Sequence, residues 1–73
     1  MSISEVQSII FDRSLWTIPQ AKSWLKKHGF FNNKVDKKPH FYRFRQIDPS
    51  YFNHYITKKT DDGIDFIIGS IHD

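Results

Sequence analysis

The segment WTIPQAKSWLKKHGF constrains the fold most, because it carries both start and stop signals for a helix. Thr17 is placed to be the N-cap, and Gln20 three residues later completes a capping box. Pro19 falls in the first turn, where a missing backbone N–H costs nothing. Gly29 can adopt the left-handed conformation that ends many helices. The sequence therefore predicts one helix over residues 18–28.

The apolar residues of this helix recur at helical spacing and therefore share one face. They are Ile18, Ala21, Trp24, Leu25 and His28. An apolar helix face needs a partner surface, and the rest of the chain supplies strands. We therefore expect an α+β fold in which one amphipathic helix packs on a small three- to four-stranded antiparallel sheet.

Strands are predicted where β-branched and aromatic residues form short runs between polar breaks. These segments are residues 6–11, 40–47, 54–60 and 64–71. Asp62-Gly63 is a hairpin turn signal, and Gly69 inside a strand suggests a bulge or a close approach of the backbone. Tyr51-Phe52 is expected to form a single helical turn that plugs the core. The polar, basic segment 32–39 is expected to be a loop.

The length of 73 residues predicts a single domain over residues 1–73. An aromatic content of 16% compensates for the small core that this length allows. The absence of cysteine excludes disulfides and thiolate metal sites. No apolar run is long enough to span a membrane, and the start MSISEVQSII lacks the basic region of a secretory signal. A soluble intracellular protein is therefore expected.

Charge is distributed unevenly along the chain. Residues 22–45 hold eight basic residues and one acid, a net charge of +7, whereas the rest holds three basic residues and seven acids, a net charge of −4. The basic middle can attract nucleic acid or an acidic protein surface, and the acidic remainder would repel the same partner.

The segment HFYRFRQI places two arginines on one face of a predicted strand. Alternation directs Tyr42 and Phe44 toward the core, and it puts Arg43 and Arg45 on the opposite face together with Phe41. The arginines could face solvent and pair with acidic residues of neighbouring strands. They could instead contact a phosphate or an acidic partner, with Phe41 as a stacking platform. They could also lie buried and hold a turn through backbone carbonyls.

A wider basic patch forms if the 32–39 loop folds toward the end of the helix. Its members would be Lys26, Lys27, Lys34, Lys37, Lys38, Arg43 and Arg45. The patch is either a solvated surface or a weak, salt-dependent nucleic-acid site, because it offers phosphate contacts without an element that reads bases. The helix lysines lie near its C-terminus, which is the wrong end for a recognition helix or for dipole-assisted phosphate binding.

No motif for catalysis or for a cofactor is present. The histidines at positions 28, 40, 54 and 72 lack metal-ligand spacing, and the serines lack a nucleophile elbow. Asp61-Asp62 is typical of a solvated turn. We therefore expect no enzymatic activity, no metal and no cofactor.

Three motifs occur together in the chain: FDxxxWTxxxAxxWLxxHGF, YRFRQxDPxxF and GIxFxIG. With them the chain resembles, over about residues 9–69, a short module found in phage and large-DNA-virus proteins, in or beside prohead proteases and other capsid-morphogenesis components. The matching positions are Phe11, Asp12, Trp16, Thr17, Ala21, Trp24, Leu25, His28, Gly29, Tyr42, Arg43, Phe44, Arg45, Gln46, Pro49, Phe52, Gly63, Ile64, Phe66, Ile68 and Gly69. The resemblance implies a viral origin and a structural or binding role, and it implies no reaction.

The combined expectation is a non-catalytic viral or phage accessory or structural module, in the virion or the host cytoplasm and not secreted. Its expected partner is a capsid or virion-assembly protein. The alternative is a small basic nucleic-acid-binding protein that uses the Arg43/Arg45 strand and the lysine loop, and an inhibitor of a host or viral enzyme is a third class. The sequence leaves the partner's identity and the oligomeric state open.

Overall fold

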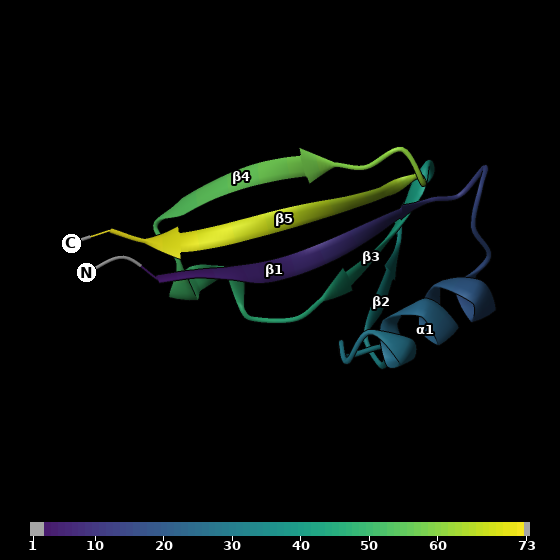
Figure 1. Ribbon diagram of the computed structural model, residues 1–73, viewed down its shortest axis with the longest axis horizontal. Coiled ribbons are helices and arrows are strands. Elements are labelled where there is room, and N and C mark those ends of the chain that lie inside the picture. The colour runs from purple at the N-terminus through teal and green to yellow at the C-terminus, as the bar shows by residue number, and fades with distance from the viewer. Residues whose placement is uncertain (1–2, 73) are drawn as a thin grey trace.

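The computed structural model describes residues 3–72 and shows one helix with a five-stranded antiparallel sheet. The elements are β1 (Ile3–Asp12), α1 (Ile18–Lys27), β2 (Val35–Lys37), β3 (Phe41–Arg45), the 3-10 turn η1 (Pro49–Tyr51), β4 (His54–Lys59) and β5 (Ile64–Ile71). The strands are ordered β2-β3-β1-β5-β4 across the sheet (Figure 1). This arrangement confirms the α+β prediction.

The sheet has one strand more than the upper end of the prediction. Part of the predicted loop 32–39 is the short strand β2, which pairs with β3 so that Asp36 lies opposite Arg43. Three residues, two of them charged, are too few to produce a visible alternation. β1 also begins at Ile3 instead of residue 6, because its first residues pair with the end of β5.

Helix α1 starts as its capping signals predict. Thr17 Oγ1 accepts from the Gln20 backbone N–H at 3.3 Å, and Gln20 Oε1 accepts from the Thr17 N–H at 3.0 Å. The helix ends at Lys27, and Gly29 follows with the predicted left-handed conformation at φ 79°. These reciprocal bonds satisfy two backbone donors that a helix start otherwise leaves open.

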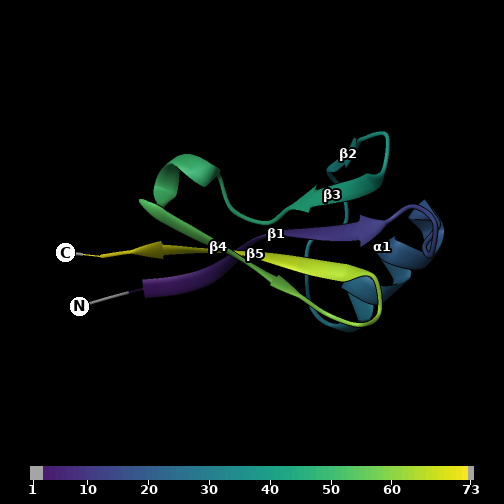
Figure 2. The ribbon, with the colours of Figure 1, turned by 90° about the horizontal axis from the view of Figure 1, so that it is seen from above.

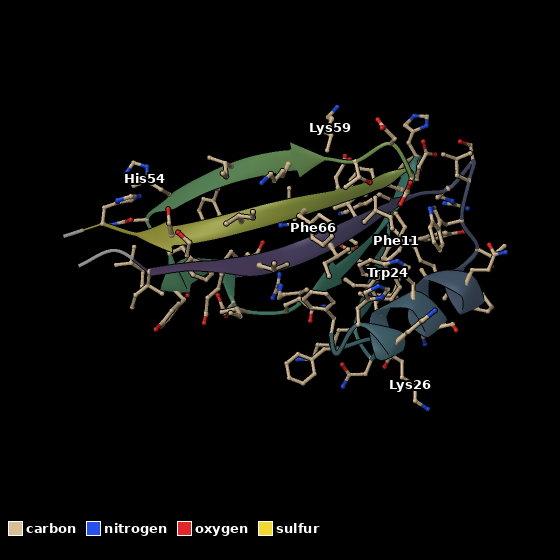
Figure 3. The ribbon with its side chains drawn as sticks, viewed as in Figure 1. Phe11, Trp24, Lys26, His54, Lys59 and Phe66 are labelled. Atoms are coloured by element: carbon tan, nitrogen blue, oxygen red, sulfur yellow. The ribbon has the colours of Figure 1, made fainter. Side chains whose placement is uncertain are left out.

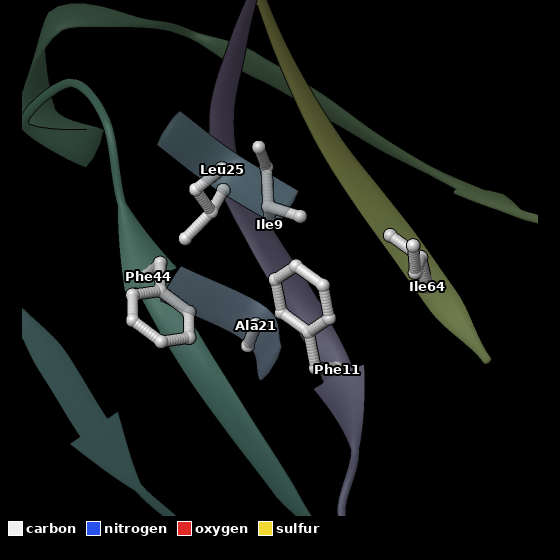
Figure 4. Packing of buried hydrophobic residues seen from close by; sticks show 6 residues of the cluster. All are labelled: Ile9, Phe11, Ala21, Leu25, Phe44 and Ile64. Carbon is white, nitrogen blue, oxygen red and sulfur yellow. The ribbon is translucent and has the colours of Figure 1, made fainter. Parts of the chain in front are cut away.

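The core lies between α1 and one face of the sheet (Figure 4). Its buried members are Ile9, Phe11, Ala21, Leu25, Phe44 and Ile64. The Phe11 ring packs edge-to-face on three aromatic rings, with centroid distances of 5.1 Å to Trp16, 5.7 Å to Trp24 and 5.6 Å to Phe44. Such pairs add to the stabilisation that buried area alone provides.

His28 differs from the predicted helix face. Ala21 and Leu25 are fully buried, whereas His28 is exposed. The His28 ring stacks on Trp24 with a centroid distance of 4.0 Å, and its Nδ1 lies 2.9 Å from the Trp24 carbonyl oxygen. The histidine therefore covers the outer side of Trp24 at the end of the helix.

The helix covers only one end of the sheet (Figures 1 and 2). Strands β1, β5 and β4 continue beyond it, and the start of β1 and the end of β5 lie at the uncovered end. The molecule is accordingly elongated, with extents of 38 × 20 × 19 Å. Much of the sheet surface is therefore left without a helix over it.

The predicted aromatic turn does not plug the core between α1 and the sheet; it packs on the face away from α1, over the far end of the sheet. The turn is η1, and Phe52 directly after it is 7% exposed. A Cβ added to Gly69 would lie 2.3 Å from Phe52 Cδ2. The predicted close approach at Gly69 is therefore made by an aromatic ring, and Phe52 forms a contact separate from the main core cluster.

Asp12 stabilises the turn that follows β1, and its carboxylate makes the stability of the domain depend on pH. Its Oδ1 accepts from the Ser14 hydroxyl at 2.7 Å and from the Ser14 N–H at 2.8 Å. These bonds favour the carboxylate and lower the pKa of Asp12 below its ordinary value of 3.8. Its contribution to stability is therefore present above the unfolded pKa and is lost as the pH falls through the folded pKa.

Ser14→Ala is expected to move the pKa of Asp12 back up toward 3.8, because the hydroxyl is the largest cause of the lowering. Carbon-13 NMR titration of the Asp12 carboxyl group measures both midpoints. A pKa of Asp12 at or above 3.8 in the wild type would contradict the hydrogen bonds from Ser14 to its carboxylate.

Candidate binding surfaces

The alternation predicted for β3 is confirmed. Phe44 is fully buried, and Tyr42 packs against the core cluster. On the opposite face Arg43 is half-buried and Arg45 is exposed. The two guanidiniums therefore share a face but differ in how freely solvent reaches them.

Arg43 fits none of the three interpretations of the sequence completely. Its Nε donates to Ser8 Oγ at 3.2 Å and its Nη2 donates to Gln7 Oε1 at 3.1 Å. These partners are neutral side chains, neither acidic residues nor main-chain oxygens. Within residues 3–72 neither Arg43 nor Arg45 forms an ion pair. Hydrogen bonds from Ser50 and, more weakly, the charge of Arg45 lower the pKa of Asp48, so Arg45 has one carboxylate in its neighbourhood.

Gln7 and Ser8 are functional candidates that the sequence reasoning missed. Both are fully buried, and they lie where the register between β1 and β5 shifts between Val6 and Ser8. The backbone carbonyl oxygen of Gln7 also accepts hydrogen bonds from the backbone N–H groups of Gln46 and Ile47. The sequence does contain a signal for them, the polar pair QS inside the apolar run VQSIIF. Polar side chains that are buried in a strand need hydrogen-bond partners, so the pair indicates a polar contact inside the fold.

Three of the predicted cations line one groove on the face away from α1. We call it the arginine groove; its volume is about 410 Å³ and its lining residues are Lys34, Val35, Asp36, Arg43, Arg45 and Pro49. The carboxylate of Asp36 lies 3.3 Å from Lys38 Nζ, so its charge is partly balanced. The groove therefore combines three cations with one carboxylate whose charge Lys38 partly balances.

The other predicted site residues lie elsewhere. Lys37 pairs with Tyr42 and so belongs to the helix side of the sheet. Lys26 and Lys27 lie in the last turn of α1, and Lys26 points away from the sheet (Figure 3). The patch predicted from the sequence is therefore divided, because the helix and the arginine groove occupy opposite faces.

Phe41 does not form a stacking platform beside the arginine groove. It lines a separate depression of about 320 Å³ together with His40, Lys59 and Asp65. This depression holds charges of both signs. Phe41 is therefore placed to contact a partner on the same sheet face, but not at the arginines.

Strand β4 is a second candidate surface, and the sequence reasoning did not identify it. All six of its residues are exposed, including Tyr55 at 46% and Ile56 at 62%. β4 pairs with β5 on one side and forms the edge of the sheet on the other. The sequence predicted the strand, but position in a sheet depends on strand order, which local pattern does not reveal.

The direction of the β4 backbone groups follows from the adjacent turn. The Thr60 N–H donates to the Ile64 carbonyl oxygen at 3.1 Å, so it points toward β5. Backbone groups alternate in an antiparallel ladder. The N–H groups of Tyr55, Thr57 and Lys59 therefore point to the free edge, and that of Lys58 points to β5.

Within residues 3–72, no three His, Cys, Asp or Glu side chains gather closely enough to hold a metal ion. The helix of the described chain is too short and too polar to cross a membrane. The chain matches no protein-family model, no curated protein and no solved structure. The arginine groove, the β4 edge and the three sequence motifs are therefore the features of the chain that bear on its function.

Proposed function

We propose that this chain is a non-catalytic binding module that recognises another protein by accepting a strand at β4. The observation that carries the proposal is the exposure of all six residues of β4 at an edge of the sheet. In strand addition, main-chain hydrogen bonds give affinity and alternate side chains give specificity. Tyr55 and Ile56 would supply the apolar contacts on the two faces of the added strand.

The two edges of the sheet differ in a way that supports this choice. Natural sheets protect edges by keeping them short and charged, because an open edge invites pairing with other chains. The β2 edge follows this pattern, since it has three residues and an ion pair from Asp36 to Lys38. The β4 edge is six residues long and is charged only at its end, with Lys58 and Lys59.

The partner that we propose is a capsid or virion-assembly protein of a virus or phage. The three sequence motifs support this part, through their resemblance to a module of capsid-morphogenesis proteins. A non-catalytic role is consistent with such a partner, and we propose neither an enzymatic activity nor a cofactor for this chain. The module would then act in the virion or in the host cytoplasm.

Nucleic-acid binding is the second candidate, and the arginine groove is the observation that favours it. Three cations are available there, but Lys26, Lys27 and Lys37 lie elsewhere and would not extend the contact. Oligonucleotide binding measured at ~50 mM and ~200 mM salt tests this candidate, because phosphate contacts lose affinity steeply over that range. Retained affinity at the higher salt would argue against phosphate contacts.

Thr57→Pro is expected to abolish partner binding and to leave the domain folded. The Thr57 N–H points to the free edge, where proline is tolerated within a sheet. Its ring removes a donor that an added strand would use. The matched variant Lys58→Pro removes a bond to β5 instead, and it is expected to destabilise the domain by about 1 kcal/mol or more.

The measurement is capture by tagged protein from a lysate of infected cells, quantified for wild type, Thr57→Pro and Lys27→Gln. A partner should be captured by wild type and Lys27→Gln but not by Thr57→Pro, and thermal unfolding should show that all three variants are folded. Equal capture by wild type and Thr57→Pro would refute strand addition at β4.

A further inference from the structure

The guanidinium of Arg43 is held in one orientation by two fully buried polar side chains. Its Nε and Nη2 donate to Ser8 Oγ and Gln7 Oε1, and the Ser8 hydroxyl donates to the same Gln7 oxygen at 2.8 Å. Gln7 Nε2 donates to the Ile47 carbonyl oxygen at 2.7 Å, which fixes the amide in turn. Within residues 3–72 the structure shows no hydrogen bond from Arg43 Nη1, so this end of the guanidinium remains available to the groove.

The support for Arg43 depends on an irregularity in β1. Val6 pairs with Ile68 and Ser8 pairs with Ile67, so Gln7 is an extra residue in β1. A bulge of this kind redirects side chains, and bulges are frequent next to functional sites. Here the bulge places the side chains of Gln7 and Ser8 together under Arg43. Burying these polar groups would cost free energy if they formed no hydrogen bonds.

Two further cations face the same groove. Arg45 lies two residues along β3 on the same face, which corresponds to a spacing of roughly 7 Å. Arg45 and Lys34 are both exposed and both line the arginine groove. Their flexible charges can close on a ligand that the fixed Arg43 orients.

We propose that the arginine groove binds a single phosphate group in its monoester, dianionic form. Guanidinium forks match phosphate oxygens in geometry, and an arginine fixed in advance loses little freedom on binding. Three cations match the double negative charge of a phosphate monoester better than the single negative charge of a carboxylate ligand. This site is distinct from the proposed β4 edge, because β1 and β5 separate β3 from β4 in the sheet.

A terminal phosphate fits the groove better than a continuous nucleic-acid backbone. Lys26 and Lys27 lie on the helix, and Lys37 lies on the other face of the sheet. Lys38 pairs with Asp36, and Lys59 lines the separate depression with Asp65, so these two cations are each beside an acid and do not extend the groove. The phosphate could belong to a small molecule or to the end of a nucleic-acid strand. Both sources present the same group, and the experiment separates them.

The test is an NMR titration that follows the Arg43 Nε–H signal while inorganic phosphate replaces chloride at constant ionic strength. A saturable shift is expected for wild type. Arg45→Gln should weaken phosphate binding by about tenfold, the equivalent of losing one charge-assisted hydrogen bond. Lys27→Gln removes the same charge away from the groove, and its affinity should stay within about twofold of wild type.

A second titration compares one single-stranded oligonucleotide with and without a 5′ phosphate. Tighter binding of the phosphorylated strand supports the site and names a strand end as a ligand. A shift with inorganic phosphate and no binding of either strand supports the site with a small phosphate ester as ligand. Equal binding of both strands would overturn the monoester proposal. The absence of a saturable shift, or equal losses in Arg45→Gln and Lys27→Gln, would overturn the site itself.

Discussion

Leu25→Asp is expected to unfold the domain. Leu25 is fully buried in the seam between α1 and the sheet, where it belongs to the same cluster as Ile9 and Phe44. A carboxylate without a partner costs several kcal/mol in such a place. Domains of this size are stable by roughly 5 kcal/mol, so one such change removes most of the free energy of unfolding. Near-ultraviolet circular dichroism and proton NMR dispersion would report the loss.

The matched control is Ser23→Asp, which adds the same charge two residues earlier on the exposed side of α1. Its effect on the free energy of unfolding should stay within about 0.5 kcal/mol, as for most surface substitutions. A folded Leu25→Asp variant would contradict the helix phase. Unfolding of both variants would show that the domain tolerates no added charge on α1, whichever face carries it.

The features that the sequence predicted well are local ones. The capping box at Thr17 and Gln20 and the turn glycine Gly29 lie within a few residues of the bonds that they make, so the helix could be predicted almost to the residue. Strand alternation likewise assigned Phe44 to the core and Arg43 to the other face. Periodicity determines such facing because successive side chains alternate.

The features that the sequence did not predict are set by pairing between distant segments. The bulge at Gln7 depends on the register of β1 against β5, and the edge position of β4 depends on strand order. Strand β2 forms because β3 offers it an edge, and not because three residues favour a strand. The division of the basic patch has the same cause. Lys27 and Lys34 are close in the sequence, but only the paired sheet determines that they lie on opposite faces.

Gly69→Ala is expected to destabilise the domain through a steric conflict with Phe52. Gly69 does not have a positive φ, so alanine is compatible with its backbone. A Cβ would nevertheless lie 2.3 Å from Phe52 Cδ2 and 2.4 Å from Phe52 Cγ, closer than real contacts allow. Forcing the ring away should cost about 1–3 kcal/mol, the usual range for an overpacked site. Chemical denaturation of the variant and the wild type measures this difference.

A double-mutant cycle tests whether Phe52 is the cause. Phe52→Ala alone should cost about 3 kcal/mol or more, because the side chain is buried. In the Phe52→Ala background, Gly69→Ala should be neutral or stabilising by up to about 1 kcal/mol, since the ring is gone and alanine favours a strand over glycine. Effects that add within about 0.5 kcal/mol would refute the contact.

The same contact links packing to the proposed binding edge. The Phe52 carbonyl oxygen accepts from the Tyr55 hydroxyl at 3.3 Å, and the two rings pack edge-to-face at 6.2 Å. Tyr55 is one of the apolar contacts proposed for an added strand. Displacing Phe52 in Gly69→Ala should therefore weaken partner capture even where the variant is fully folded, whereas phosphate binding at the arginine groove should not change. A Gly69→Ala variant that is folded and captures the partner as wild type does would show that the start of β4 lies outside the interface.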